Sequence, residues 1–282
     1  MKTFAKINLT LDVLGKRPDG YHEISSVMQS LALHDTLSVT RTEGPGIKIK
    51  TDNPSLPVDN SNLVYKAAEF ILRSYNLASY GVSVEIEKKI PIAAGLAGGS
   101  SNCAAALIGL RDLFELDISE DKLYQIGKGF GADVPFCLLS GGTALAEGIG
   151  EKLTLLTPHP DMCVALARLP VHVATKEVFS RWTKEEEKKT PEMLKALAAG
   201  SIDDIAAALG NGLASTAIAM HPEIAGIMEV FRKYNACGVN MTGSGPTVFA
   251  YFHREDDAYI AINAIENIYN CHTFCTKIYN GD

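Results

Sequence analysis

Apolar and polar residues alternate strictly along residues 5–13 of the chain. The apolar positions are Ala5, Ile7, Leu9, Leu11 and Val13, and the polar positions are Lys6, Asn8, Thr10 and Asp12. A period of two predicts a half-buried strand with one face toward the core. The same period over residues 82–87 predicts a second strand.

Helical spacing follows Asn62, and the alanine-rich residues 102–114 also predict a helix. Apolar runs predict further strands at 134–139, 143–146, 162–169, 239–240, 248–252 and 273–278. Further helices are predicted at 175–183, 191–199, 202–219, 222–234 and 256–268. The charged run 184–189 is interpreted as a solvated helix face or loop. This pattern is typical of an α+β protein.

Two prolines interrupt the pattern at residues 157–161, which we interpret as a linker. This linker divides the 282 residues into a domain at 1–156 and a domain at 162–282. A hydrophobic content of 46% excludes wholesale disorder. The 26 basic and 33 acidic residues give a net charge of −7, which argues against nucleic-acid or membrane partners but allows a local phosphate site.

The N-terminus and the cysteines favour a cytoplasmic protein. Lys6 and Asp12 interrupt the first apolar run, so no signal peptide is predicted, and no stretch of about 18 apolar residues predicts a membrane span. Cys271 and Cys275 are the only closely spaced pair among six cysteines, and no second ligand pair follows at recognisable spacing. We therefore expect reduced structural cysteines and no protein-held metal site.

A glycine-rich loop runs from Pro91 to Asn102 between a predicted strand and a predicted helix. Its glycines let backbone N–H groups approach a ligand, and a helix N-terminus attracts phosphate. No Gly-Lys-Ser/Thr ends the loop, and the Gly-x-Gly-x-x-Gly spacing of dinucleotide folds is missing. A tight turn with a serine N-cap is the alternative, but three glycines and two serines within seven residues favour phosphate binding.

Two further clusters carry candidate chemistry. In Gly131–Phe136, Asp133 is either a helix cap or turn former, or a positioned base. The glycine turn Met241–Pro246 precedes an apolar strand and, taken alone, indicates only a hairpin or bulge.

Together these segments resemble the GHMP kinase superfamily, whose three marks occur in order at Ala5–Leu9, Pro91–Ser101 and Met241–Phe249. The resemblance implies an N-terminal domain like ribosomal protein S5 domain 2, a ferredoxin-like C-terminal domain, and a catalytic cleft between them. Within the superfamily, the chain resembles the kinases that act on 4-diphosphocytidyl-2-C-methyl-D-erythritol. The segments that carry this closer resemblance are Ala5–Leu9, Arg17–His22, Gly131–Phe136 and Gly141–Ala144.

The chain departs from the family pattern at a few positions. Ala93 and Ala97 stand where the family often has glycine, and Asn211-Gly-Leu-Ala214 replaces a more usual Asn-Asp start of a helix.

This resemblance implies that ATP phosphorylates the 2-hydroxyl of 4-diphosphocytidyl-2-C-methyl-D-erythritol, with Mg²⁺ held largely by phosphates and water. That reaction belongs to the non-mevalonate route to isoprenoids. A monomer or weak homodimer is expected. Two alternatives stay open: another GHMP small-molecule kinase of the homoserine or mevalonate type, and a catalytically silent nucleotide-binding protein on the same fold.

The resemblance also assigns site residues. Asp133 is expected to be the general base and Lys6 its partner beside the reacting oxygen, although Lys6 taken alone is typical of a solvent-facing strand lysine. The ATP and phosphate residues are Pro91, Ile92, Ala93, Ala94, Gly95, Leu96, Ala97, Gly98, Gly99, Ser100 and Ser101, with Asn62, Leu63 and Lys88 near adenosine. The substrate residues are Asn8, Tyr21, His22, Thr175, Phe179, Gly243 and Gly245. Phe179 would stack on the pyrimidine opposite Tyr21, although a helix core position is its simpler interpretation.

Overall fold

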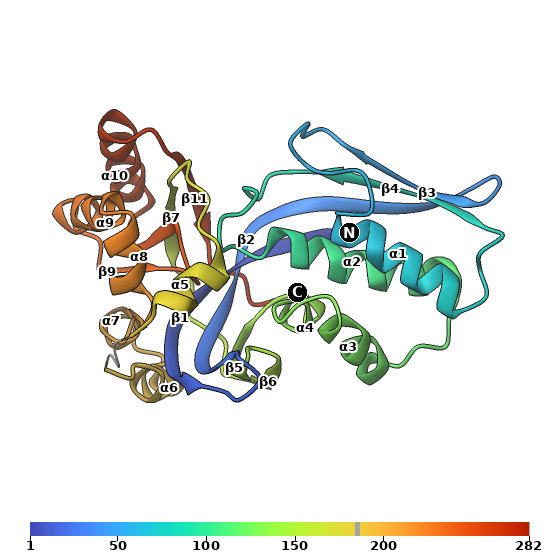
Figure 1. Cartoon of the computed structure of the whole chain (residues 1–282). Coiled ribbons are helices and arrows are strands. Elements are labelled where there is room, and N and C mark those ends of the chain that lie inside the picture. Colours follow the sequence, from blue (N-terminus) through green and yellow to red (C-terminus); the bar gives the residue numbers. More distant parts are fainter. Residues whose placement is uncertain (184–186, 282) are drawn as a thin grey trace. The chain divides into compact units, whose positions relative to one another are not determined.

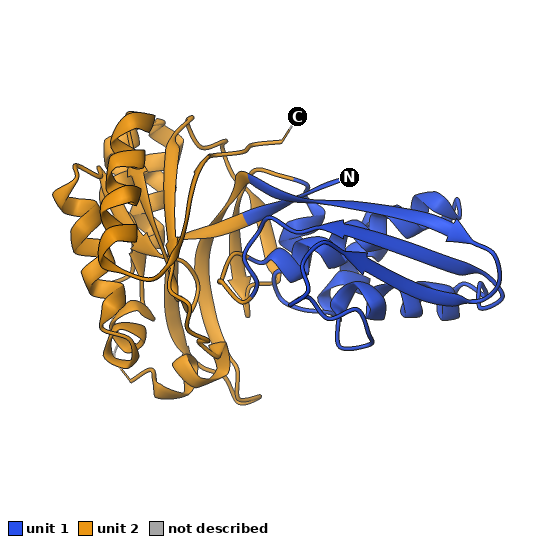
Figure 2. Ribbon diagram, turned by 90° about the horizontal axis from the view of Figure 1, so that it is seen from above, with its two compact units in different colours: residues 1–5, 33–92, 97–140 blue, residues 6–32, 93–96, 141–282 orange. Residues whose placement is uncertain are grey.

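A computed structural model describes residues 1–183 and 187–281, which form two compact units. Unit 1 comprises residues 1–5, 33–92 and 97–140, and unit 2 comprises residues 6–32, 93–96 and 141–282 (Figure 2). Strands β1 (Lys2–Lys16) and β2 (His22–Thr42) contribute residues to both units. The segment predicted as a linker, 157–161, contains no helix or strand, but it lies within unit 2.

Unit 1 packs helices on a short sheet. The C-terminal half of β2 pairs antiparallel with β4 (Gly81–Glu87), and β4 pairs parallel with β3 (Gly46–Thr51). The helices of this unit are α1 (Leu63–Ser74), α2 (Gly98–Leu113), α3 (Glu120–Lys128) and α4 (Val134–Leu138), labelled in Figure 1. Buried side chains of α1 and α2 pack with Val82, Val84 and Ile86 of β4 to form the core of this unit.

Unit 2 contains most of β1, from Lys6 onward, and the N-terminal half of β2. In this unit, β2 pairs antiparallel with β5 (Thr143–Gly148), which pairs with β6 (Lys152–Leu155). Strand β1 pairs in parallel with the two-residue strand β8 (Gly210–Asn211), with Leu11 opposite Asn211.

A second sheet of unit 2 has the strand order β11-β7-β10-β9, and every adjacent pair is antiparallel. Its strands are β7 (Cys163–Arg168), β9 (Gly238–Met241), β10 (Thr247–Phe252) and β11 (His272–Lys277). The helices of unit 2 are α5 (Thr175–Arg181), α6 (Thr190–Ala199), α7 (Ile202–Ala207), α8 (Ala214–Met220), α9 (Glu223–Lys233) and α10 (Glu255–Ile268). Helices α9 and α10 lie beside this sheet (Figure 1). Their apolar side chains pack on it. This strand order with its connecting helices is that of a ferredoxin-like domain.

Most predicted elements are confirmed within a few residues, including the helices after Asn62 and near 256–268 and the strands near 82–87 and 248–252. The strand predicted at 134–139 is wrong, because α4 occupies that segment. Pro135 stands in the first turn of α4, where its fixed φ suits a helix and its missing N–H breaks no bond.

The single helix predicted at 202–219 is also wrong, since α7 and α8 are separated by β8. Gly210 and Gly212 lower helix propensity there, and Gly212 N donates instead to Leu11 O at 2.8 Å. Of the charged run 184–189, residues 184–186 lie outside the described residues, and 187–189 are not helical. Sequence patterns did not predict most of β2, nor β3, β6 and α3.

The polar face of β1 is buried, so the prediction of a half-buried strand is wrong there. Lys6, Asn8, Thr10 and Asp12 are each at most 5% exposed. Asp12 accepts hydrogen bonds from the backbone N–H groups of Lys189 and Thr190, both at 2.9 Å, at the start of α6. Buried polar groups are retained when they find such partners.

Helix α2 begins four residues earlier than predicted, and its N-cap Ala97 has φ 56° and ψ 23°. This left-handed conformation costs an L-residue about 1–2 kcal/mol because Cβ crowds the backbone. No side chain caps the helix at Ala97.

We predict that Ala97→Gly raises the free energy of unfolding by about 0.5–1 kcal/mol, since glycine adopts positive φ without that cost. Urea unfolding followed by circular dichroism measures the change. Ala198→Gly, at an exposed position in α6, is the matched control and should lower stability by up to about 1 kcal/mol. Destabilisation by both substitutions would contradict the prediction.

Candidate active site

The ammonium group of Lys6 lies at the centre of a polar cluster in unit 2. Its Nζ donates to Asn8 Oδ1 at 2.7 Å, and Asn8 Nδ2 donates to Ser26 Oγ at 2.9 Å. Thr242 Oγ1 accepts from the backbone N–H of Asn8 at 3.0 Å and lies 3.2 Å from Asn8 Oδ1. The strand β1 therefore presents Lys6 and Asn8 to the glycine turn that contains Thr242.

This turn is bonded to residues 93–96 of the glycine-rich loop. Thr247 Oγ1 donates to Ala94 O at 2.6 Å, and Thr242 Oγ1 lies 3.5 Å from Gly95 O. Lys6 N donates to Leu96 O at 3.1 Å. Because three successive loop carbonyls are occupied in this way, the path of the backbone here is determined by β1 and by the turn.

Two glycines are required where these segments meet. Gly95 has φ +73°, and a Cβ there would lie 3.0 Å from Thr242 O. Gly243 has φ +58°, and a Cβ there would lie 3.6 Å from Asn8 Oδ1 and 3.8 Å from Lys6 Nζ. Glycine provides both the left-handed backbone and the close approach. Gly245 also has positive φ and precedes a cis proline, Pro246.

A helix of unit 2 joins the same turn. Thr175, the first residue of α5, has its Oγ1 2.9 Å from Ser244 Oγ. Sequence reasoning missed Ser26, Thr242 and Ser244 as members of the site. For Thr242 and Ser244 the signal was available, because both stand in the glycine motif beside the predicted Gly243 and Gly245.

In unit 1, the rest of the glycine-rich loop forms the start of α2. The first described bond of the helix runs from Ser101 N to Ala97 O at 2.8 Å, so Gly98, Gly99 and Ser100 supply the first-turn N–H groups. The alternative of a serine N-cap is wrong, since Ala97 holds that position. A 16-residue helix with this start carries a partial positive charge suited to phosphate.

The three residues predicted near adenosine also lie in unit 1. Lys88 Nζ donates to Asp35 Oδ2 at 2.7 Å and to Ile90 O, and burial lowers the pKa of Lys88 while Asp35 opposes this change. A Cβ on Gly98 would lie 3.0 Å from Lys88 Nζ, and one on Gly99 would lie 4.0 Å from Leu63. Asn62 accepts from Val64 N and so caps α1. Lys88 and Leu63 thus flank the start of α2.

Asp133 precedes α4 in unit 1 and is half-buried. It occupies the N-cap position, but its carboxylate accepts no capping hydrogen bond from the helix. The helix-cap interpretation made from sequence is therefore wrong, while the roles of turn former and of positioned base both stay predictions.

Three aromatic rings gather in unit 2 at the predicted pyrimidine site. His22 stacks on Phe179 with ring centroids 5.0 Å apart, and the rings of His22 and Trp182 are nearly perpendicular with centroids 5.7 Å apart. Burial and the nearby Lys16 lower the pKa of His22, which favours the neutral ring. Tyr21 is 61% exposed, and the ring that faces Phe179 is that of His22. Trp182 was missed by sequence reasoning.

The structure therefore brings together two groups of predicted residues. In unit 2, the residues around the glycine turn are Lys6, Asn8, Gly95, Thr175 and Gly243. His22 and Phe179 are in contact elsewhere in the same unit. In unit 1, Leu63 and Lys88 join Gly98 and Gly99, while Asp133 lies at the start of α4. The pairing of Lys6 with Asp133 joins residues of different units and stays a prediction.

The described cysteines are unbridged, and Cys163 Sγ lies 3.5 Å from Cys275 Sγ on the adjacent strand.

Within residues 1–183 and 187–281, His, Cys, Asp and Glu side chains form no group of three or more suited to a metal ion. None of the helices described for this chain is both long enough and apolar enough to span a bilayer.

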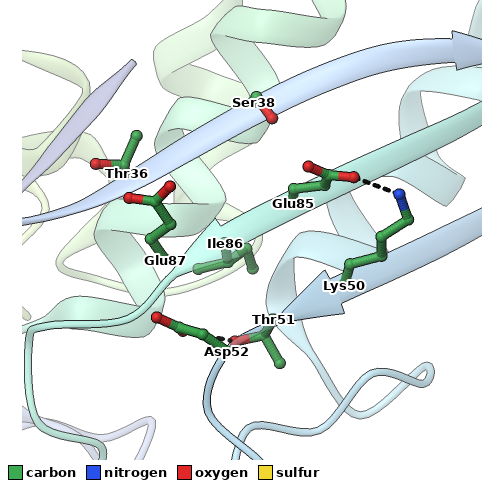
Figure 3. A pocket seen from close by; sticks show the side chains of 8 residues that line it. All are labelled: Thr36, Ser38, Lys50, Thr51, Asp52, Glu85, Ile86 and Glu87. Atoms are coloured by element: carbon green, nitrogen blue, oxygen red, sulfur yellow. Dashed lines mark hydrogen bonds and ion pairs between the residues drawn. The ribbon is translucent and has the colours of Figure 1, made fainter.

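A shallow pocket of about 260 Å³ lies in unit 1, and none of the predicted site residues lines it, although Lys88 N donates to its lining residue Asp52 at 2.8 Å. It is open to solvent over β4, between Thr36 and Ser38 of β2 and the end of β3 (Figure 3). The ion pair of Lys50 with Glu85 crosses one side, and Asp52 and Glu87 add negative charge. This acidic lining does not suit a phosphate ligand.

Comparison with known families and proteins agrees with this geometry. The profile of the GHMP kinases N terminal domain matches residues 62–141, and that of the GHMP kinases C terminal region matches residues 193–271. The 4-diphosphocytidyl-2-C-methyl-D-erythritol kinase of Caldicellulosiruptor saccharolyticus is 43% identical over 94% of this chain and 92% of its own. That of Clostridioides difficile is 44% identical over 92% and 88%.

Solved structures extend the comparison. A crystal structure of 4-(cytidine 5'-diphospho)-2C-methyl-D-erythritol kinase matches with a TM-score of 0.84 and 30% identity over 100% of this chain and 99% of its own. A homoserine kinase from Cytophaga hutchinsonii matches with a TM-score of 0.75 and 16% identity over 100% of this chain and 96% of its own. At this identity the match shows a shared fold alone. The chain therefore belongs to the GHMP kinase family, with the 4-diphosphocytidyl-2-C-methyl-D-erythritol kinases among its relatives.

Proposed function

We propose that the chain transfers the γ-phosphoryl group of ATP to the 2-hydroxyl of 4-diphosphocytidyl-2-C-methyl-D-erythritol, releasing ADP and the 2-phosphate. The observation that carries the proposal is the position of Lys6. Its buried ammonium group is held by Asn8 beside Gly243, and its backbone N–H donates to the glycine-rich loop. The substrate is inferred from the names of relatives that are 43–44% identical to this chain. On this proposal the protein acts in the cytoplasm as a monomer or weak homodimer.

The start of α2 and its loop would receive the phosphates of ATP. The first-turn N–H groups of Gly98, Gly99 and Ser100 and the helix dipole favour negative charge. A chain with a net charge of −7 must bind polyanions through such local donors. Leu63, beside Gly99, and the capping residue Asn62 border the adenosine side.

Phosphoryl transfer needs an oriented acceptor and charge stabilisation more than covalent help from the protein. Asp133 would accept the proton of the 2-hydroxyl as it attacks the γ-phosphorus, and Lys6 would stabilise the negative charge on the reacting oxygens. Asn8, held by Ser26 and Thr242, keeps the Lys6 ammonium in place during this step.

Mg²⁺ is proposed to accompany ATP, where it neutralises phosphate charge. The hydroxyls of Ser100 and Ser101 are hard oxygen donors of the kind that this cation accepts, and they would lie beside it or its water ligands. The remaining ligands would be phosphate oxygens and water.

The cytidyl end would bind at the aromatic cluster. Phe179 offers a ring face that His22 covers at 5.0 Å, and the exposed Tyr21 precedes His22 in the chain. A pyrimidine between Phe179 and Tyr21 would displace His22 from that face and leave its neutral ring to hydrogen-bond the base. The backbone turn at Gly243 and Gly245, with Thr175, would border the erythritol side.

A coupled ADP-release assay with a panel of acceptors tests the proposal. Turnover with 4-diphosphocytidyl-2-C-methyl-D-erythritol and none with homoserine or mevalonate is expected. Turnover with either of the other acceptors alone would support the alternative small-molecule kinase. ATP binding without any turnover would support the catalytically silent alternative.

We predict that Asp133→Asn lowers kcat by about 10²–10⁴-fold, the usual contribution of a general base, while ATP affinity and Tm change little. Single-turnover ADP release and calorimetric ATP titration measure the two effects. Asp117→Asn, at an exposed loop position of unit 1, is the matched control and should retain full activity. Undiminished turnover by the Asp133 variant would remove this carboxylate as base.

We predict that Phe179→Ala raises KM for the cytidyl substrate about tenfold or more and leaves KM for ATP within about twofold, since base stacking contributes about 1–3 kcal/mol. Trp182 is the only tryptophan of the chain and meets His22, so its fluorescence also reports cytidine diphosphate binding. Phe70→Ala removes a partly exposed ring in unit 1 as control. Equal effects on both substrates would refute the stacking role.

A further inference from the structure

The segment Asn211–Ala214 departs from the family pattern, and the chemistry proposed above gives it no role. In the structure it begins in β8, where Gly210 and Asn211 pair with Thr10 and Leu11 of β1. Gly212 N donates to Leu11 O at 2.8 Å. The backbone of Asn211 is thus fixed to the strand that carries Lys6 and Asn8.

The side chain of Asn211 is 7% exposed and makes three hydrogen bonds. Its Nδ2 donates to Met241 O at 2.7 Å and to Gly243 O at 2.8 Å, and its Oδ1 accepts from Leu213 N at 2.9 Å. With two carbonyls on one side and an N–H on the other, only one orientation of the amide satisfies all three bonds.

The two carbonyls that Asn211 holds flank Thr242. Thr242 bonds Asn8, and Gly243 lies against Asn8 Oδ1 and Lys6 Nζ. A shift of this turn would therefore change the position of the amide that holds the Lys6 ammonium. Loss of the Asn211 amide would remove a donor from both carbonyls at once, because Asn211 Nδ2 bonds both.

We propose that Asn211 is a positioning residue of the phosphoryl-transfer site, which fixes the 241–243 turn and through it Asn8 and Lys6. The inference rests on the proposed function, because the turn matters for catalysis only if Lys6 does. Asn211 itself would touch neither substrate, so its loss should lower kcat rather than raise KM.

Asn211→Asp tests this proposal most sharply. The carboxylate keeps the acceptor for Leu213 N but places an oxygen where Nδ2 donates to two carbonyls, and the repulsion should open the turn. At pH 8.5 we expect kcat to fall at least about tenfold, with KM for both substrates within about threefold. Protonation of the buried carboxyl, whose pKa burial raises, restores one donor, so kcat relative to the parent protein should recover about threefold or more by pH 6.

Two further variants separate positioning from loss of fold. Asn211→Ala should lose kcat to a similar extent but show no recovery at low pH, since it has no group to protonate. Asn280→Asp is the matched control, because Asn280 Nδ2 donates to His159 O at 2.9 Å elsewhere in unit 2. Far-ultraviolet circular dichroism and Tm establish that each variant is folded.

Parental kcat in folded Asn211→Asp at pH 8.5 would overturn the inference, as would an equal kcat loss in Asn280→Asp. A rise in KM with unchanged kcat would also overturn it. An inactive parent protein, in contrast, would overturn the proposed function and this inference with it.

Discussion

The structure depends on the burial of a polar strand face. One face of β1 is apolar and packs in the core, while the opposite face carries Lys6, Asn8, Thr10 and Asp12 at no more than 5% exposure. An unpaired buried polar group costs about 1–3 kcal/mol, so each of these side chains needs a partner. The partners come from β2, from the start of α6 and from the turn before β10, and the strand thereby fixes distant segments of unit 2.

This constraint links stability to the candidate site. The Asn8 amide bonds Ser26 and Thr242 as well as Lys6, and Thr242 also approaches Gly95 O in the glycine-rich loop. The hydrogen bonds that hold the strand are thus the ones that place Lys6. A substitution in this network should therefore affect both fold and catalysis, which is why matched controls and separate readouts of stability are needed.

The sequence motifs indicated the candidate site residues better than they indicated the neighbouring residues that hold them in place. The motifs around Lys6, Gly95 and Gly243 were recognised, and the structure places these three residues together in unit 2. Thr242 and Ser244 were missed although they stand in the recognised glycine motif. Asn211 was missed because its role comes from contacts with residues up to 32 positions away, which no local pattern records. The roles of Asp133 and Phe179 stay proposals.

By itself, the sequence determined the period of its strands and helices, the glycine positions and the family, because these depend on residue type and local spacing. Tertiary structure decided that Lys6 is buried and that the loop is held by Thr242 and Thr247. It also decided that residues 134–138 form a helix and that Asn211 interrupts another. An alternating pattern separates two faces of a strand, but only the packed chain determines whether water or protein covers the polar one.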